Sequence, residues 1–132
     1  MVEKLRKIMY NINEEYFNFE DLPKIRWSKG RIQKRYRRIT LGTYDAGKDL
    51  IRIHPAFREE LLPAFVMEFV IYHELLHYED RHFLLKRRRG QRVHTPGFHK
   101  REKEHPDKKR AQLIIHEFMK GHTIKANTGD NT

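Results

Sequence analysis

The chain has 132 residues, which is the length of one ordinary domain and leaves no room for two catalytic domains. Its net charge is +10, and 38% of its residues are hydrophobic, which is enough for a modest core and argues against disorder. It contains no cysteine, so a disulfide framework, a thiol nucleophile and a thiolate metal site are excluded.

The same composition argues against a membrane protein. The most apolar segment, Leu61–Leu76, is interrupted by a proline, two glutamates and a histidine, whereas a spanning helix needs about 20 consecutive apolar residues. Charged and apolar residues alternate in Met1–Tyr10, which is unlike the apolar stretch of a secretory signal. We therefore predict a soluble, cytoplasmic protein with no membrane partner.

The first half of the chain predicts one helix and then a small sheet. Apolar residues recur at three- and four-residue spacing in Val2–Phe17, which is typical of an amphipathic helix. Alternation of apolar and polar residues then marks three short strands, Ile25–Trp27, Tyr36–Tyr44 and Leu50–Ile53. We expect these strands to form a mainly antiparallel sheet.

The second half predicts helices. The segment around Leu62–His77 is apolar nearly all round at helical spacing, so this helix should be central. Thr95 and Pro96 suit the N-cap and first position of a second helix, and a last amphipathic helix should end at Gly121. The fold class is therefore α+β, with one domain over residues 1–120 and a polar, flexible tail over 121–132.

The central helix contains the strongest motif in the sequence, HELLH at residues 73–77. Histidines four residues apart project side by side from a helix, so His73 and His77 can bind one metal ion. In an H-E-x-x-H motif the glutamate, here Glu74, does not bind the metal but acts as the general base beside its water. An accidental match is the alternative, but buried histidines and a carboxylate without a metal would lack polar partners.

A catalytic zinc needs a third protein ligand, which must come from farther along the chain. His94 is the first candidate, because it immediately precedes the predicted helix start at Thr95 and that helix can press it against the metal. Glu102 and Glu117 remain the alternatives, since either could reach back from a later helix.

The segment Val70–Phe83 (VIYHELLHYEDRHF), followed by HTPGF at residues 94–98, resembles the SprT-like metallopeptidases and the similar minigluzincins. The resemblance extends to the order of helix, three strands and helix, and it implies a small zincin-like fold. It also implies His73, His77 and His94 as ligands of one Zn²⁺ per chain and Glu74 as the catalytic base.

These residues predict a zinc metalloendopeptidase whose substrate is a protein or peptide. Bound zinc lowers the pKa of its water to about 7, so hydroxide is supplied at neutral pH. Glu74 would take the proton of this water and pass it to the leaving amine. An exposed strand edge, in Ile39–Tyr44 or Leu50–Ile53, could hold an extended peptide.

Two basic segments, Lys24–Arg38 and Lys86–Arg92, suggest a second interpretation. Such clusters can follow a phosphate backbone without regard to sequence, although a solvated basic surface explains them as well. The chain would then be a nucleic-acid-associated protein in which peptidase activity is linked to DNA or zinc is purely structural. The candidate contacts are Arg35, Arg37, Arg38, Arg87, Arg88 and Arg89.

The polar tail gives a third interpretation. His122 could occupy the open position of the zinc and make the enzyme latent. Removal of residues 122–132 should then raise activity.

Overall fold

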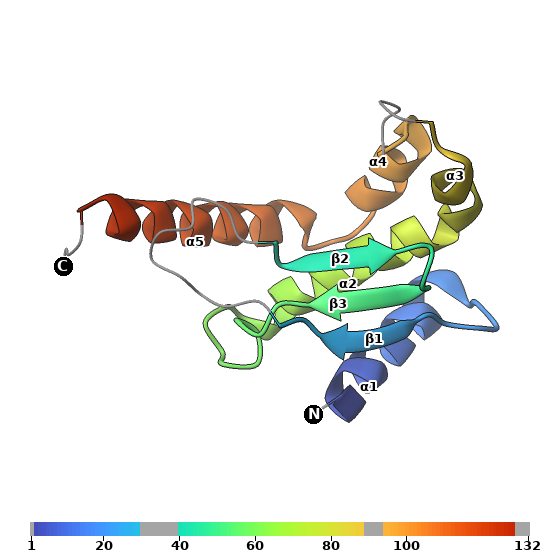
Figure 1. Ribbon diagram of the computed structural model, residues 1–132, viewed down its shortest axis with the longest axis horizontal. Helices are drawn as coiled ribbons and strands as arrows, with labels where there is room; N and C mark the ends of the chain where they lie inside the picture. The colour runs from blue at the N-terminus through green and yellow to red at the C-terminus, as the bar shows by residue number, and fades with distance from the viewer. Residues whose placement is uncertain (1, 30–39, 89–93, 129–132) are drawn as a thin grey trace.

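A computed structural model describes residues 2–29, 40–88 and 94–128 of the chain (Figure 1). In chain order its elements are α1 (Val2–Ile12), the π-helical turn η1 (Asn13–Phe17), β1 (Lys24–Trp27), β2 (Gly42–Asp45), β3 (Leu50–Ile53), α2 (Ala64–Glu79), α3 (Arg81–Lys86), α4 (Pro96–Lys103) and α5 (Lys108–Thr128). The predicted α+β class, with an N-terminal helix, three strands and a central helix that carries the motif, is confirmed.

The three strands form a mixed sheet in the order β1-β3-β2. β2 and β3 pair antiparallel, as the short turn between Asp45 and Leu50 requires. β1 pairs with the other edge of β3 in parallel, from Lys24 opposite Leu50 to Trp27 opposite Ile53. The expectation of a mainly antiparallel sheet therefore holds for one of these two pairings, because alternation in sequence encodes which face is buried and not the direction of the neighbouring strand.

The helices differ from the predictions in two places. Among the described residues, three helices follow α2 rather than two, because α2 ends at Glu79 and α3 forms a separate short helix from Arg81. The last helix does not stop at Gly121 but continues to Thr128, so the predicted end was wrong. A glycine inside a helix costs only about 1 kcal/mol relative to alanine, and the helix can pass through it.

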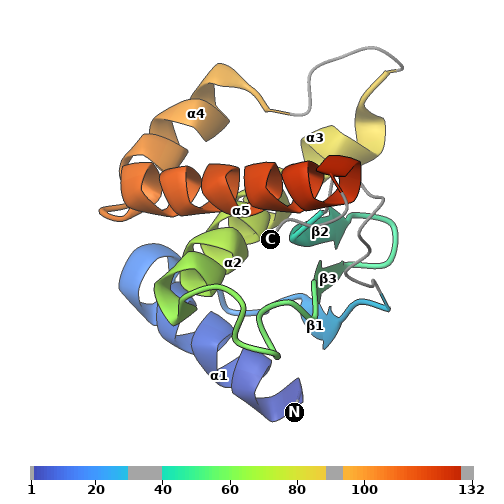
Figure 2. The same ribbon diagram turned by 90° about the vertical axis from the view of Figure 1, so that its left-hand side faces the viewer.

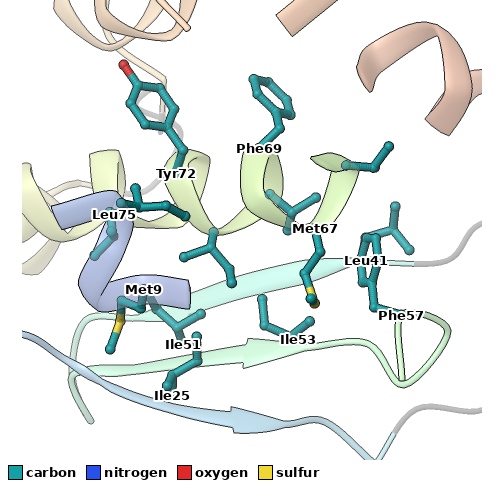
Figure 3. Close-up of a cluster of buried hydrophobic side chains, with 14 of the residues drawn as sticks. Met9, Ile25, Leu41, Ile51, Ile53, Phe57, Met67, Phe69, Tyr72 and Leu75 are labelled. Atoms are coloured by element: carbon teal, nitrogen blue, oxygen red, sulfur yellow. The ribbon is translucent and has the colours of Figure 1, made fainter. Parts of the chain in front are cut away.

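Helix α2 lies at the centre of the molecule, and this explains its uniformly apolar sequence. It packs on the sheet, and α1, α4 and α5 cover its other sides (Figure 2). Figure 3 shows Met67 directed at the sheet, near Ile53, whereas Phe69 and Tyr72 point away from it. Both groups are buried, so the helix is fixed on opposite sides and can hold functional side chains rigidly.

Within the described residues, the structure contains no helix with the length and apolar character needed to cross a membrane.

Candidate metal centre

Three imidazoles converge at the carboxyl-terminal half of α2. His73 and His77 lie one turn apart on this helix, and His94 approaches them from the segment just before α4. One ligand atom from each ring can be chosen so that all three lie within 4.8 Å of one another. The Nε2 atoms of His77 and His94 are 3.1 Å apart. The structure thus brings together the three histidines that the sequence singled out.

The start of α4 places His94. Thr95 is the N-cap of this helix, and its Oγ1 accepts a hydrogen bond from the backbone N–H of Phe98 at 3.2 Å. The buried ring of Phe98 lies 4.5 Å from the ring of His77 and 4.6 Å from that of His94, measured between centroids. The Thr95 cap and the packing of Phe98 against both rings therefore fix the orientation of the His77 and His94 imidazoles.

Glu102, an alternative third ligand by sequence, instead lies behind His73. Its Oε2 is 2.5 Å from Nδ1 of His73. The other nitrogen of that ring, Nε2, therefore points away from Glu102. Burial opposes protonation of His73, but the hydrogen bond to Glu102 and the charges of Glu74 and Glu102 outweigh it and raise the pKa of His73. A carboxylate in this position fixes the tautomer and rotation of a metal-binding imidazole.

The spacing of His77 and His94 fits a zinc ion, and a ligand atom of His73 lies within 4.8 Å of theirs. Two nitrogens at about 2.0 Å from one tetrahedral zinc are separated by roughly 3.3 Å, close to the 3.1 Å between His77 and His94. Burial, followed by repulsion from His73 and His94, lowers the pKa of His77 to about 3, so this ring is neutral and can donate its lone pair. Burial also lowers the pKa of His94. The donor set is three imidazoles, a type of ligand that zinc accepts readily, and binding of the metal would displace the proton that the neighbouring carboxylates favour on His73.

Glu74 lies beside this centre and is almost fully buried. Burial raises the pKa of its carboxyl to about 7, although the charge of His73 acts in the opposite direction. Its Oε2 faces Gly42 at the start of β2: a Cβ added to this glycine would lie 3.3 Å from that oxygen and 2.5 Å from Cγ1 of Val70. A carboxyl that titrates near neutrality, next to a cation site, is suited to accept and return a proton.

Two cavities meet at this point, and His73 and Glu74 line both of them. One extends along α2 toward α5 and the other extends toward His94 and the end of α3. The outer strand β2 borders both through Gly42.

The remaining sequence candidates lie elsewhere. Glu117 is exposed on α5 and does not line either cavity. Arg87 and Arg88 are exposed just after α3, and Arg87 lines the cavity on the His94 side. Arg35, Arg37, Arg38 and Arg89 lie outside the described residues, as does the side chain of His122.

Sequence reasoning missed two features of the site. The contact of Glu102 with His73 depends on how α4 packs across α2, which local spacing does not encode. The close approach of β2 to α2 at Gly42 left only a weak signal in the sequence, which is a glycine in a strand segment that otherwise alternates. A glycine inside a strand often marks such an approach.

This small α+β arrangement is consistent with a zincin-like metallopeptidase fold. The crystal structure of the metallopeptidase zymogen abylysin from Pyrococcus abyssi is similar, with a TM-score of 0.60 over 92% of this chain and 94% of that chain. The two sequences are 16% identical, so the likeness concerns the fold. No protein-family model and no curated protein sequence matches the chain.

Proposed function

We propose that the chain is a zinc-dependent metallopeptidase that hydrolyses peptide bonds. The observation that carries this proposal is the convergence of His73, His77 and His94 beside the buried carboxyl of Glu74. The fold likeness to a metallopeptidase zymogen supports it. The three imidazoles would hold the zinc, and Glu102 would orient His73.

The chain's own residues then account for the proton transfers. When bound, zinc supplies an activated water and polarises the scissile carbonyl. Glu74 accepts a proton from the water as its oxygen adds to the carbonyl carbon. As the carbon–nitrogen bond breaks, Glu74 returns the proton to the leaving nitrogen, so an amine and a carboxylic acid result. β2, an edge strand of the sheet that the described residues form, would hold the extended substrate along the side that faces away from β3.

The test is the substitution Glu74→Gln, which keeps the shape of the side chain but removes its basicity. We expect cleavage of an unfolded protein substrate such as casein to fall by a factor of about 10² to 10⁴, while the zinc content stays unchanged. Glu117→Gln, a glutamate on the exposed side of α5, is the matched control and should cleave normally. Undiminished cleavage by the Glu74→Gln protein would refute the assignment of the base.

A nucleic-acid-associated role is the second candidate, and the observation that favours it is the charge. The net charge is +10, and Arg87 lies at the cavity beside His94, so a bound nucleic acid could pass close to the site. Binding would be independent of sequence and would weaken steeply with salt. A mobility-shift titration with single- and double-stranded DNA at 50 and 200 mM salt tests this. Absence of any shift at the lower salt concentration would remove the candidate.

A further inference from the structure

A groove lies between α1 and β1, at the edge of the sheet opposite β2. It has a volume of about 550 Å³ and is here called the α1–β1 groove. In the strand order β1-β3-β2, β1 and β2 are the two outer strands, and Figures 1 and 2 show α1 near β1 and α5 near β2. Among the described residues, the α1–β1 groove shares none with the two cavities beside Glu74. A ligand bound here would therefore leave the candidate metal centre open.

Four cations line the α1–β1 groove, and no acidic residue of the described chain lines it. Arg6 and Lys7 belong to α1, and Lys24 and Arg26 belong to β1. All four residues are exposed, and within the described part of the chain none of them forms an ion pair. Like charges that line one groove without counter-charges create a positive potential there. The α1–β1 groove should therefore attract an anionic ligand.

Apolar side chains lie between these cations. Met9 of α1 and Ile25 of β1 are buried in the core, and Leu22 is partly buried and packs against the same core cluster. Tyr10, one turn after Arg6, is 54% exposed and also lines the groove. Since the apolar residues are held by core packing, the groove is preformed, and its volume is in the usual range of ligand sites. A matching occupant carries both apolar groups and negative charges.

We infer that the α1–β1 groove binds an acidic segment of a partner protein that also carries aliphatic side chains such as leucine. The carboxylates of this segment would pair with the four cations, and its leucines would contact Leu22 and Met9. A nucleic acid matches less well, because unpaired bases stack on aromatic rings and Tyr10 is the one aromatic residue among the described residues that line the groove. The inference does not depend on the proposed peptidase function, since binding here uses no residue of the metal centre.

The direct test is the binding of a fluorescein-labelled octapeptide, EELEELEE, measured by fluorescence anisotropy. The Glu74→Gln protein is used, so that the peptide stays intact whether or not the unaltered protein is a peptidase. We expect saturable binding that weakens as the salt concentration rises from about 50 to 300 mM, because salt screens exposed charges. Absence of binding at the lower salt concentration would refute the inference.

Two further peptides separate the charge from the apolar contact. QQLQQLQQ lacks the carboxylates and EESEESEE lacks the leucines, so each should bind at least about tenfold more weakly than EELEELEE. Equal binding of EESEESEE would show that the groove acts only as a solvated basic surface, and equal binding of QQLQQLQQ would show that its charges select nothing. Either result would overturn the inference.

Charge reversals locate the binding site. Arg6→Glu/Arg26→Glu should weaken the binding of EELEELEE at least about tenfold, because two attractions become repulsions. The matched control is Lys100→Glu/Lys109→Glu, which changes the net charge equally at exposed positions on α4 and α5 outside the groove. Its affinity should match that of the Glu74→Gln parent. An equal loss of affinity in the control would indicate unspecific attraction and contradict the assignment of the groove.

A second pair of substitutions and a second ligand complete the test. Lys7→Glu/Lys24→Glu again alters one cation from α1 and one from β1, and it repeats the measurement if the first pair unfolds the protein. Undiminished binding in a folded variant of either pair would refute the site. Single-stranded octathymidylate represents the alternative occupant. If it binds more tightly than EELEELEE and loses this affinity in the same variants, the groove is a nucleic-acid site and the inference is wrong.

Discussion

At Gly42, β2 passes close to the helix that carries the site. A Cβ here would meet Cγ1 of Val70 at 2.5 Å, and the carboxylate of Glu74 lies just beyond. We predict that Gly42→Ala lowers the free energy of unfolding by about 1–3 kcal/mol through overpacking. It should also displace Glu74 and reduce cleavage.

The double variant Gly42→Ala/Val70→Ala provides the control. Truncation of Val70 removes the clashing atom, so the double variant should be more stable than the sum of the two single effects predicts. Chemical denaturation of the four proteins measures this coupling. Strict additivity would contradict the account of Gly42.

His105 is a buried histidine outside the candidate metal centre. It packs against the rings of Tyr16, Phe69 and Tyr72, and its Nδ1 accepts a hydrogen bond from the backbone N–H of Asp107 at 3.1 Å. Burial lowers its pKa, although the nearby carboxylates of Asp107 and Glu15 act in the opposite direction. The folded protein therefore binds fewer protons at this residue than the unfolded chain does.

This shift predicts a pH dependence of stability. Well above the ordinary histidine pKa of about 6.5, His105 is neutral in both states, and as the pH falls the unfolded chain is protonated first, so the free energy of unfolding decreases. His105→Asn retains an acceptor for the Asp107 N–H but cannot titrate. The free energy of unfolding, measured in urea between pH 5 and 7.5, should therefore fall less steeply toward acid pH for this variant than for the unaltered protein. An equal or steeper fall in the free energy of unfolding would contradict the lowered pKa of His105.

Among the elements, α4 contributes most to the site after α2. It carries Phe98 beneath the histidines and Glu102 behind His73. Its end is attached to α2 through Arg101, whose Nη1 donates to both carboxylate oxygens of Glu79 at 2.8 Å, and to η1, where Nη2 donates to the backbone oxygen of Tyr16 at 3.5 Å. The hydroxyl of Tyr72 also donates to the backbone oxygen of Arg101 at 2.6 Å. These contacts fix the residue that immediately precedes Glu102.

The position of Glu102 predicts an effect on metal binding. Glu102→Gln keeps an acceptor near Nδ1 of His73 but removes the negative charge, and loss of such a partner usually weakens metal binding 10- to 100-fold. Competition with a chromophoric chelator measures the zinc affinity. The matched control is Glu117→Gln, at an exposed position on α5, which should bind zinc as the unaltered protein does. Unchanged affinity in Glu102→Gln would show that this carboxylate does not support His73.

The elements also show what sequence can predict. The apolar α2 was predictable because helical spacing and burial on several sides both appear in local sequence. The approach of His94 was predictable because the Thr95 cap and Pro96 mark where α4 begins. The parallel pairing of β1 and the break at Asp80 were not, since both depend on packing between segments distant in sequence. The place of Glu102 behind His73 was unpredictable for the same reason.

At the scale of the whole molecule, the structure is a sheet and a set of helices with the candidate site at their junction. The site combines side chains of α2 with residues of β2, of the segment before α4 and of α5. Figures 1 and 2 show how these elements are arranged around α2. Since each contributes, the centre exists only in the folded chain. A metal that binds this centre should therefore stabilise the folded state, by about 2.7 kcal/mol at a free concentration 100 times its dissociation constant.

The central claim is that His73, His77 and His94 together bind one zinc ion. X-ray absorption spectroscopy of the zinc-loaded protein, combined with elemental analysis, tests it most directly. We predict one zinc per chain with three imidazole ligands at about 2.0 Å, and at most two imidazole ligands after His94→Ala. No bound zinc, or the same three-imidazole coordination in the His94→Ala protein, would contradict the claim.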